Sequence, residues 1–212
     1  MVTSAQEFQK ATGVSRETLS AFEDWYARLS AANAHTNLVG RSTLGEFWSR
    51  HALDGFQLID LAPGDGKNWL DFGAGAGIPG LAIALGMRDR QWAGAHVTFV
   101  ESIGKKARFI SECVDALALK AEVHNARVEA LPQINKFEVI TARAVAALPK
   151  LLTYAYPLLK SAGICLFPKG ERYRQELTDA RKYWTFEEEI HPSRTSDAGV
   201  ILRLRNIKPR KG

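Results

Sequence analysis

The sequence predicts an α/β fold in which a mostly parallel, seven-stranded sheet follows an N-terminal helical extension. Two observations predict it. Short apolar segments alternate with helical segments from residue 68 to residue 183, and the chain then ends in two strand-like segments with no helix between them. Strands that alternate with helices pair in parallel, with helices on both faces of the sheet. Two consecutive strands joined by a turn pair antiparallel, so we expect an antiparallel edge.

The first 66 residues are expected to form the helical extension. Ser15 is a suitable N-cap for a helix over residues 15–33, and the apolar residues of that helix share one face: Leu19, Phe22, Trp25, Tyr26 and Leu29. A second helix is expected over residues 43–59, with one stripe made of Leu44, Phe47, Trp48 and His51. The segment APGDG at residues 62–66 predicts a turn that ends the extension.

Residues 67–207 are expected to form the sheet domain, and residues 208–212 a basic tail. The predicted strands cover residues 68–72, 96–101, 121–125, 137–143, 163–170, 184–192 and 200–207. The predicted helices cover residues 78–87, 103–119, 146–159 and 171–183. The strands are short apolar runs, whereas the helices space their apolar residues three or four positions apart.

The composition is that of a globular protein, with 46% hydrophobic and 24% charged residues in 212 positions. A chain of this length buries a substantial core without disulfides. Cys113 and Cys165 lack metal-ligand spacing, and no segment has the pattern of a signal peptide or a bilayer span. We therefore expect a cytoplasmic protein, and a monomer by default. The net charge of +5 permits a polyanionic partner but does not require one.

The segment GAGIPG at residues 75–80 matches the pattern G-x-G-x-x-G between a strand and a helix. Glycines allow a tight turn and close approach of a ligand, and the N-terminus of the following helix offers free N–H groups. These properties suit a dinucleotide, a phosphate or S-adenosylmethionine. The pattern alone predicts a cofactor loop without identifying its ligand.

Two carboxylates narrow the choice of ligand. Asp71 precedes the glycines and would attract the ammonium or sulfonium charge of S-adenosylmethionine, whereas it would repel a pyrophosphate. Glu101 ends the next strand, near the spacing at which an acid accepts both ribose hydroxyls, a feature that NAD and S-adenosylmethionine share. Asp71 therefore favours S-adenosylmethionine, with a structural cap or a solvated strand end as the alternative.

The loop segment DFGAGAGIPGLAIA at residues 71–84 resembles the cofactor motif of the 16S rRNA guanine-N7 methyltransferase family, small-subunit methyltransferase G, also called glucose-inhibited division protein B. Other segments are similar to that family in the same order: NLVGRSTLGEFWSRHALDG (37–55), ESIGKKARFISE (101–112), ARVEAL (126–131), ITARAVAAL (140–148) and FPKG (167–170). One departure is Ala32, where the family has tryptophan. The resemblance implies a Rossmann-like fold of the class I methyltransferases. It also implies an enzyme that methylates a guanine in the decoding-site loop of 16S rRNA.

The resemblance also implies the residues of the cofactor site. In the glycine loop it implies Gly73 and Ile78, beside Asp71, Gly75 and Gly77, which the loop pattern and the charge of Asp71 already indicate. The ribose and the adenine would lie against Glu101, Ser102, Val128 and Glu129. Arg143, at the end of the fourth strand, would face both the cofactor and the incoming base. The carboxyl ends of parallel strands are where open α/β sheets bind ligands, which agrees with these positions.

The residues after the fourth strand exclude several methyl acceptors. TARAVAAL at residues 141–148 lacks the Asn- or Asp-Pro-Pro-aromatic run of enzymes that methylate amino groups. We expect Cys113 and Cys165 to be core residues rather than nucleophiles, and no carboxylate–histidine cluster indicates a metal. Guanine N7 has a free lone pair, so its methylation needs no general base.

Arg143 and Lys169 are expected to position the base through O6 or N7, or to hold a phosphate. The alternatives are a structural ion pair for Arg143 and a solvated turn for Lys169. The candidate RNA contacts are Arg41, Arg50, His51, Lys169 and Arg172. Each basic cluster alone is more often a solvated face, and a histidine on an apolar stripe is more often half-buried with satisfied hydrogen bonds. The expected partner is 16S rRNA or the small ribosomal subunit.

Two other functions fit parts of the sequence. A nucleotide-dependent oxidoreductase would use the glycine pattern and Glu101, although the chain has no recognisable hydride-relay site. A non-catalytic RNA-binding module for ribosome assembly would use the basic clusters and keep only a vestigial pocket. Binding of NAD without S-adenosylmethionine would indicate the first, and tight rRNA binding without turnover the second.

Overall fold

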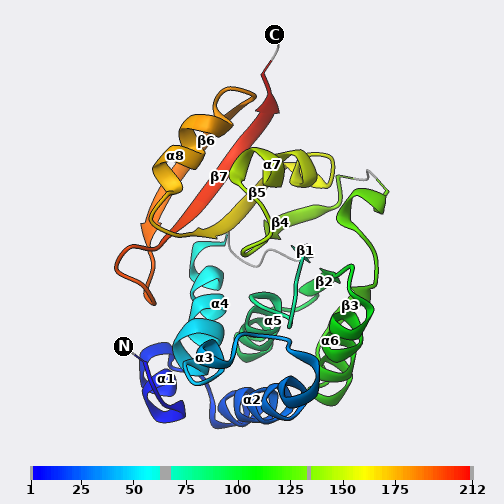
Figure 1. Ribbon diagram of the computed structural model, residues 1–212, viewed down its shortest axis with the longest axis vertical. Coiled ribbons are helices and arrows are strands. Elements are labelled where there is room, and N and C mark those ends of the chain that lie inside the picture. The colour runs from blue at the N-terminus through cyan, green and yellow to red at the C-terminus, as the bar shows by residue number, and fades with distance from the viewer. Residues whose placement is uncertain (1, 63–67, 133–134, 211–212) are drawn as a thin grey trace.

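The computed structural model describes residues 2–62, 68–132 and 135–210, apart from the side chain of Arg41. Within these ranges, seven strands form one sheet in the order β3-β2-β1-β4-β5-β7-β6 (Figure 1). The strands are β1 (Asn68–Phe72), β2 (His96–Val100), β3 (Ala121–His124), β4 (Phe137–Thr141), β5 (Leu159–Lys169), β6 (Trp184–Pro192) and β7 (Val200–Pro209). The first five pair in parallel, and β7 lies antiparallel between β5 and β6. The predicted α/β fold is confirmed.

Alternate residues of the central strands face two separate hydrophobic clusters. On β1, Trp69 belongs to one cluster, while Leu70 and Phe72 belong to the other. The first cluster packs the sheet against the N-terminal helices, α5 (Gly80–Asp89) and α6 (Gly104–Ala116), which fill the lower part of the view in Figure 1. The second packs it against α7 (Leu148–Ala155) and α8 (Tyr173–Ala180). Helices therefore cover both faces, as a parallel sheet requires.

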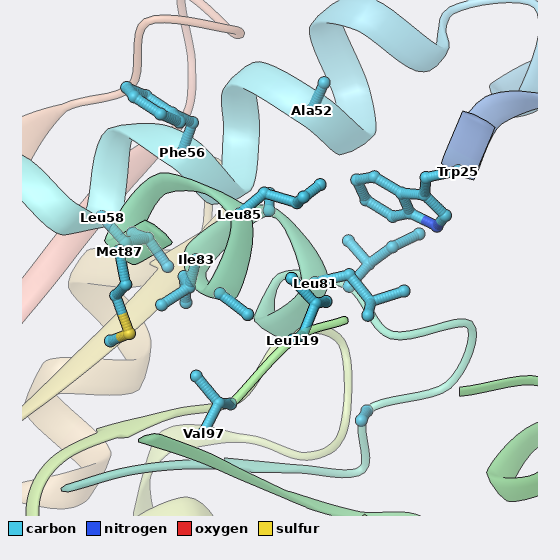
Figure 2. Close-up of a cluster of buried hydrophobic side chains, with 14 of the residues drawn as sticks. Trp25, Ala52, Phe56, Leu58, Leu81, Ile83, Leu85, Met87, Val97 and Leu119 are labelled. Carbon is cyan, nitrogen blue, oxygen red and sulfur yellow. The ribbon is translucent and has the colours of Figure 1, made fainter. Parts of the chain in front are cut away.

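The N-terminal helices pack on α5 and share its core. Figure 2 shows Trp25 of α2 (Arg16–Thr36) and Phe56 of α4 (Asp54–Phe56) around Leu81 and Leu85 of α5. These four residues are at most 2% exposed. Full burial of such a side chain contributes about 1.5–3 kcal/mol relative to exposure, so the extension stabilises the same core as the sheet.

The extension begins with a helix that the sequence prediction omits. This helix, α1 (Ala5–Thr12), has Ser4 as its N-cap, because the Ser4 side chain accepts the backbone N–H of Glu7. It buries only Ala5 and Phe8. Two apolar positions are too few to give a recognisable helical period, which explains the omission.

The single helix predicted over residues 43–59 is divided in the structure. It consists of α3 (Arg41–Leu44), a π-helical turn at Trp48–Leu53, α4, and a 3₁₀ turn at Gln57–Leu61. From His51 to Ile59 every residue except Asp54 is buried. The segment is thus packed on all sides, and neighbours rather than local propensity set its backbone.

Strand ends also differ from the prediction. Helix α7 ends at Ala155 and β5 begins at Leu159, where the prediction extends the helix to residue 159 and starts the strand at 163. Leu159 pairs with Phe137 of β4, which gives the early part of β5 backbone partners. Strand β7 continues to Pro209, so the predicted basic tail begins as strand. The turn predicted at residues 62–66 falls almost entirely outside the described residues.

Candidate functional site

The loop between β1 and α5 turns on three glycines with positive φ: Gly73 at 64°, Gly75 at 58° and Gly77 at 81°. A Cβ on Gly73 would lie 2.4 Å from Cγ2 of Val145, and a Cβ on Gly77 would lie 2.4 Å from Cδ1 of Leu81. At Gly75 an added Cβ would meet only the carbonyl oxygen of Gly73, at 4.0 Å. The loop is therefore tightly packed at both ends and open at Gly75, where a ligand can approach the backbone.

Glu101, the residue after β2, holds the open part of this loop. It is 5% exposed, and its Oε2 accepts the backbone N–H of Gly75 at 2.7 Å. Its Oε1 accepts the N–H of Ile103 at 2.8 Å, and its carbonyl oxygen accepts Nδ2 of Asn125 at 2.8 Å. A carboxylate fixed in this way keeps further lone pairs for hydroxyl donors. The structure thus places Glu101 beside Gly75 at the carboxyl edge of the sheet.

Asp71 lies inside the protein beneath the same loop. It is 1% exposed; Oδ2 accepts the N–H of Gly80 at 3.0 Å, and Oδ1 accepts the hydroxyl of Thr141 at 3.0 Å. Burial raises the pKa of this carboxyl to about 7, against the opposing effect of the two hydrogen bonds. Both oxygens brace the loop against α5 and β4, which matches the structural cap considered for Asp71, whereas the solvated strand end is wrong. Its attraction of a cofactor charge stays a prediction.

The other predicted cofactor residues lie at the same edge of the sheet. Ile78 is buried in the loop, and Ser102 is exposed between β2 and α6. Val128 and Glu129 form a 3₁₀ turn after β3, with Val128 buried and Glu129 exposed. The backbone N–H of Glu129 and the Tyr154 hydroxyl lower the pKa of the Glu129 carboxyl. Contacts of these residues with a cofactor stay predictions.

A cleft of about 940 Å³ lies at the ends of β4 and β5 and under the β6–β7 connection. Val145 lines this cleft and also packs against Gly73 of the glycine loop. Its neighbour Ala144 has a φ of 57°, which is uncommon for a residue with a Cβ. This backbone turn directs the segment after β4 across the loop. Val145 therefore stands at the boundary between the loop and the cleft.

Charged residues of both signs line the cleft. The cations are Arg50, Arg143, Lys169 and Arg172, and the carboxylates are Glu46, Asp54, Glu176, Asp179 and Asp197. Three cations form ion pairs within the cleft: Arg50 with Glu46 at 2.5 Å, Arg143 with Asp54 at 2.8 Å, and Lys169 with Glu176 at 2.7 Å. The lining carries no excess of positive charge, so it lacks the electrostatic character of a phosphate site.

The structure brings the two predicted positioning residues, Arg143 and Lys169, into this one cleft. Arg143 lies two residues past the end of β4 and is engaged in an ion pair, the structural alternative considered for it. Lys169 ends β5; its side chain is 8% exposed and donates to Glu176 and to the carbonyl oxygen of Ala146 at 3.2 Å. The solvated turn considered for Lys169 is therefore wrong.

Of the predicted RNA contacts, His51 differs most from expectation. It is 2% exposed, and neither ring nitrogen has a hydrogen-bond partner among the described residues. Burial, together with the smaller effect of the nearby Arg143 charge, lowers the pKa of its imidazole to about 4. The expected half-buried histidine with satisfied hydrogen bonds is wrong, and the ring is closed to RNA in this conformation. Arg172 is exposed, whereas the Arg41 side chain lies outside the described residues.

Both cysteines are core residues, as predicted. Cys113 and Cys165 are 0% exposed. Burial raises the pKa of the Cys113 thiol to about 12 and also raises that of Cys165, so neither supplies a thiolate nucleophile. In the described parts of the chain, no group of three His, Cys, Asp or Glu side chains is arranged to hold a metal ion. No helix in those parts has both the length and the apolar character needed to cross a bilayer.

Three residues shape the cleft although the sequence prediction does not select them: Asp54, Val145 and Thr195. Asp54 follows Arg50 by four positions in a helical segment, a spacing that brings side chains to one face and could have indicated it. Thr195 donates to Oδ1 of Asp54 at 2.7 Å from 141 positions away, and it has no local signal. Val145 stands in the TARAVAAL segment, where its contact with Gly73 depends on the turn at Ala144.

Comparison with known proteins adds independent findings. The family model described as GidB, rRNA small subunit methyltransferase G, matches residues 18–200. Ribosomal RNA small subunit methyltransferase G of Methylobacterium nodulans is 44% identical over 200 residues, which are 93% of this chain and 92% of the relative. The protein of the same name from Caulobacter vibrioides is 40% identical over 206 residues, 97% of this chain and 93% of the relative.

Solved structures share the fold. The O-methyltransferase from Bacillus cereus, solved in complex with SAH, superposes with a TM-score of 0.60 at 15% identity, covering 88% of this chain and 90% of the other. At this level of identity the likeness concerns the fold alone.

Proposed function

Because the chain belongs to the GidB family of rRNA small subunit methyltransferases G, we propose that it transfers a methyl group from S-adenosylmethionine to N7 of a guanine in 16S rRNA. The proposed target lies in the decoding-site loop. The observation that best supports this reaction is the position of Val145, which touches Gly73 of the glycine loop and lines the adjoining cleft. Methyl transfer needs the methyl donor and the acceptor atom in contact and in line. The glycine loop, proposed to hold the donor, and the cleft, proposed to hold the acceptor, meet at Val145.

The glycine loop fits S-adenosylmethionine. Bound there, the cofactor supplies an electrophilic methyl group. The open backbone at Gly75 gives room for a ligand, and the Glu101 carboxylate beneath it has lone pairs for ribose hydroxyls. Ser102, Val128 and Glu129 extend this edge and are proposed to bind the adenosine. Asp71 supports the site by holding the start of α5 to β1 and β4.

Guanine N7 is the proposed acceptor because it needs no deprotonation. No residue is assigned as a general base: His51 and both cysteines are buried, and Glu46, Asp54 and Glu176 of the cleft are engaged in ion pairs. N7 attacks with its free lone pair, so the chain has to orient the base and exclude water. An arginine at N7 would occupy that lone pair. Arg143 is therefore proposed to donate to O6, and Lys169 to fix the Ala146 carbonyl and α8 beside the base.

The charges of the cleft suit this reaction better than they suit phosphate binding. A guanine methylated at N7 carries a positive charge, which develops during the transfer. Five carboxylates against four cations leave the lining slightly acidic, and such an environment stabilises a base that becomes cationic. We propose that the RNA backbone is held outside the cleft by exposed basic residues, with Arg172 and Arg50 at its rim.

The proposed partner is 16S rRNA within the small ribosomal subunit. The names of the relatives refer to small-subunit ribosomal RNA, which supports this substrate class. The proposed site of action is the cytoplasm, where ribosomal subunits are assembled, and the proposed working unit is a monomer. The oxidoreductase considered from the glycine pattern finds no support in the family comparison.

The test is methyl transfer from radiolabelled S-adenosylmethionine to small ribosomal subunits that lack the modification. Large subunits and tRNA are the control substrates, and the label is then mapped to a nucleotide. Label at N7 of a single 16S guanine is the expected result. Tight binding of rRNA without any label would instead indicate a non-catalytic assembly module, and label at another atom or RNA would contradict the proposed acceptor.

A further inference from the structure

Asp54 connects three parts of the molecule that are far apart in the sequence. Its Oδ2 accepts Nη1 of Arg143 at 2.8 Å, 89 positions away. Its Oδ1 accepts the hydroxyl of Thr195 at 2.7 Å, 141 positions away, and Nε2 of Gln57 at 3.1 Å. The carboxylate thus joins the N-terminal helices, the segment after β4 and the β6–β7 connection at one point.

This carboxylate is well shielded from water. The Asp54 side chain is 13% exposed and its partner Arg143 is 25% exposed. A shielded charge is stable only when an opposite charge and hydrogen bonds compensate for lost hydration. Asp54 has one cation and two further donors, so removing its charge leaves the Arg143 guanidinium without its counter-ion.

The guanidinium of Arg143 is fixed from one side only. Its Nη1 donates both to Asp54 and to the carbonyl oxygen of Arg50 at 2.5 Å. Neither Nε nor Nη2 has a recorded hydrogen bond to a described residue. A planar guanidinium held at one nitrogen presents the others in a fixed direction, here in a residue that lines the cleft.

The β6–β7 connection depends on the same group. Besides the bond from Thr195 to Asp54, the N–H of Arg194 donates to Oε1 of Gln57 at 2.8 Å, and Gln57 is 3% exposed. Thr195 and its neighbours Ser196 and Asp197 line the cleft. The part of the cleft wall next to Arg143 is therefore attached to the N-terminal helices through Asp54 and Gln57.

We propose that Asp54 is a positioning residue: it orients Arg143 toward the target base and holds the β6–β7 connection beside it as part of the cleft wall. The inference rests on the proposed methyl transfer and deepens it. It makes the N-terminal helices part of the catalytic geometry, because the backbone and side chain that fix Arg143 both belong to them. Asp54 itself touches neither the base nor the cofactor.

The test is Asp54→Asn, which keeps the size of the side chain and removes its charge. Because misorientation acts on the transition state, we expect kcat to fall roughly ten- to a hundredfold, while KM for S-adenosylmethionine and for the subunit stays within about twofold. In the Arg143→Ala background, Asp54→Asn should cause little further loss, because both changes remove one interaction. Full additivity of the two losses would overturn the inference.

Asp24→Asn is the matched control. Asp24 is also a carboxylate of the N-terminal helices paired with an arginine, Arg28, but it lies outside the cleft lining and its side chain is 42% exposed. Its replacement should leave kcat unchanged. Equal losses in Asp54→Asn and Asp24→Asn would show a general structural effect and overturn the specific role.

A second measurement does not depend on activity. Exchange of the Arg143 guanidinium protons with solvent, followed by NMR of labelled arginine, should be slow in the wild type and fast in Asp54→Asn. Amide hydrogen exchange at residues 193–199 should accelerate in the same variant and in Thr195→Val. If the wild type transfers no methyl group, the proposed function fails. The exchange rates would still show whether Asp54 fixes Arg143 and the β6–β7 connection. Unchanged exchange in Asp54→Asn would overturn the inference.

Discussion

The glycine loop and the cleft beside it are built from different interactions. The loop is held by backbone groups, glycine contacts and buried acids: Asp71 accepts from Gly80, nine positions away, and Glu101 accepts from Gly75, 26 positions away. The cleft is held by ion pairs between side chains, of which Arg143–Asp54 spans 89 positions. The loop therefore depends mainly on one β-α-β unit, with added contacts from Thr141 and Val145, whereas the cleft depends on the whole chain being folded.

This difference separates two kinds of sensitivity. A change in the loop meets close packing and a desolvated carboxyl, so it should act mainly on stability. A change in the cleft meets ion pairs whose side chains range from 8% exposed at Lys169 to 54% exposed at Arg50, and the more exposed pairs contribute little to stability because water competes for them. Substitutions in the cleft should therefore change the free energy of unfolding less than they change catalytic activity.

The largest effect should be the pH dependence that Asp71 imposes on stability. Burial raises its pKa from 3.8 to about 7. The folded chain holds this proton more tightly than the unfolded chain, so Asp71 makes the wild type lose stability as pH rises between about 4 and 7. Asp71→Asn lacks this titration. The variant should gain stability relative to the wild type over that window, by up to about 4 kcal/mol, and the difference should be constant at higher pH.

The measurement is urea unfolding of both proteins at several pH values from 4 to 8. The difference between the two curves isolates Asp71, because the remaining carboxylates titrate in both proteins. Asp179→Asn provides a comparison of opposite sign, because the hydrogen bond from Lys182 lowers the pKa of this partly exposed aspartate. A difference that stays flat from pH 4 to pH 8 would mean that Asp71 is not a buried, proton-binding carboxyl.

Close packing under the loop should give the next effect. A Cβ on Gly80 would lie 2.3 Å from Cε1 of Phe99 and 2.7 Å from Oδ2 of Asp71. Gly80→Ala should therefore lower the free energy of unfolding by about 3 kcal/mol, since neither a buried ring nor a bonded carboxyl can easily move. Gly170→Ala is the control, because an added Cβ there meets nothing within 4 Å. Equal stability of the two variants in urea unfolding would contradict the tight packing.

The sequence predicts the loop side of the molecule more completely than the cleft side. The positions of β1, β2 and α5, and the placing of Glu101 beside Gly75, follow from apolar periods and one motif that involve neighbouring segments. Asp71 is correctly placed at the strand end, but its complete burial depends on Thr141 and Phe99, which come from other strands.

The cleft could be predicted only in part, because its interactions join distant segments. Arg143 and Lys169 were recognisable through a family resemblance, whereas their partners Asp54 and Glu176 were not. The error at His51 has the same origin. The helical stripe predicts a half-buried histidine, whereas packing of the N-terminal helices on α5 buries all faces of this segment. The local sequence pattern predicts the helix or strand in which a residue lies, whereas tertiary packing determines its burial and its hydrogen-bond partners.

On the cleft side, Arg143→Ala should affect activity more than stability. Loss of a donor to O6 should reduce kcat about a hundredfold, which is the effect of removing one preorganised donor from an active site. The Asp54 carboxylate loses its counter-ion but keeps Thr195 and Gln57 as donors, so the free energy of unfolding should fall by a smaller amount, about 1–2 kcal/mol. Steady-state methyl transfer to small subunits measures the first and unfolding the second. Arg181→Ala, which removes a surface ion pair with Glu188, is the control and should change neither kcat nor stability. An unchanged kcat in Arg143→Ala would contradict the role proposed for Arg143.

The smallest effect should come from Glu46→Gln. Glu46 pairs with Arg50 at 2.5 Å, but both side chains are about half exposed, so the stability change should stay within about 0.5 kcal/mol. The variant frees the Arg50 charge at the cleft rim, where an RNA phosphate can take the place of the carboxylate. Affinity for small subunits should rise slightly and depend more steeply on salt, by up to one released counter-ion. A loss of stability comparable to that of Gly80→Ala would show that the cleft is as tightly built as the loop, and the contrast between them would fail.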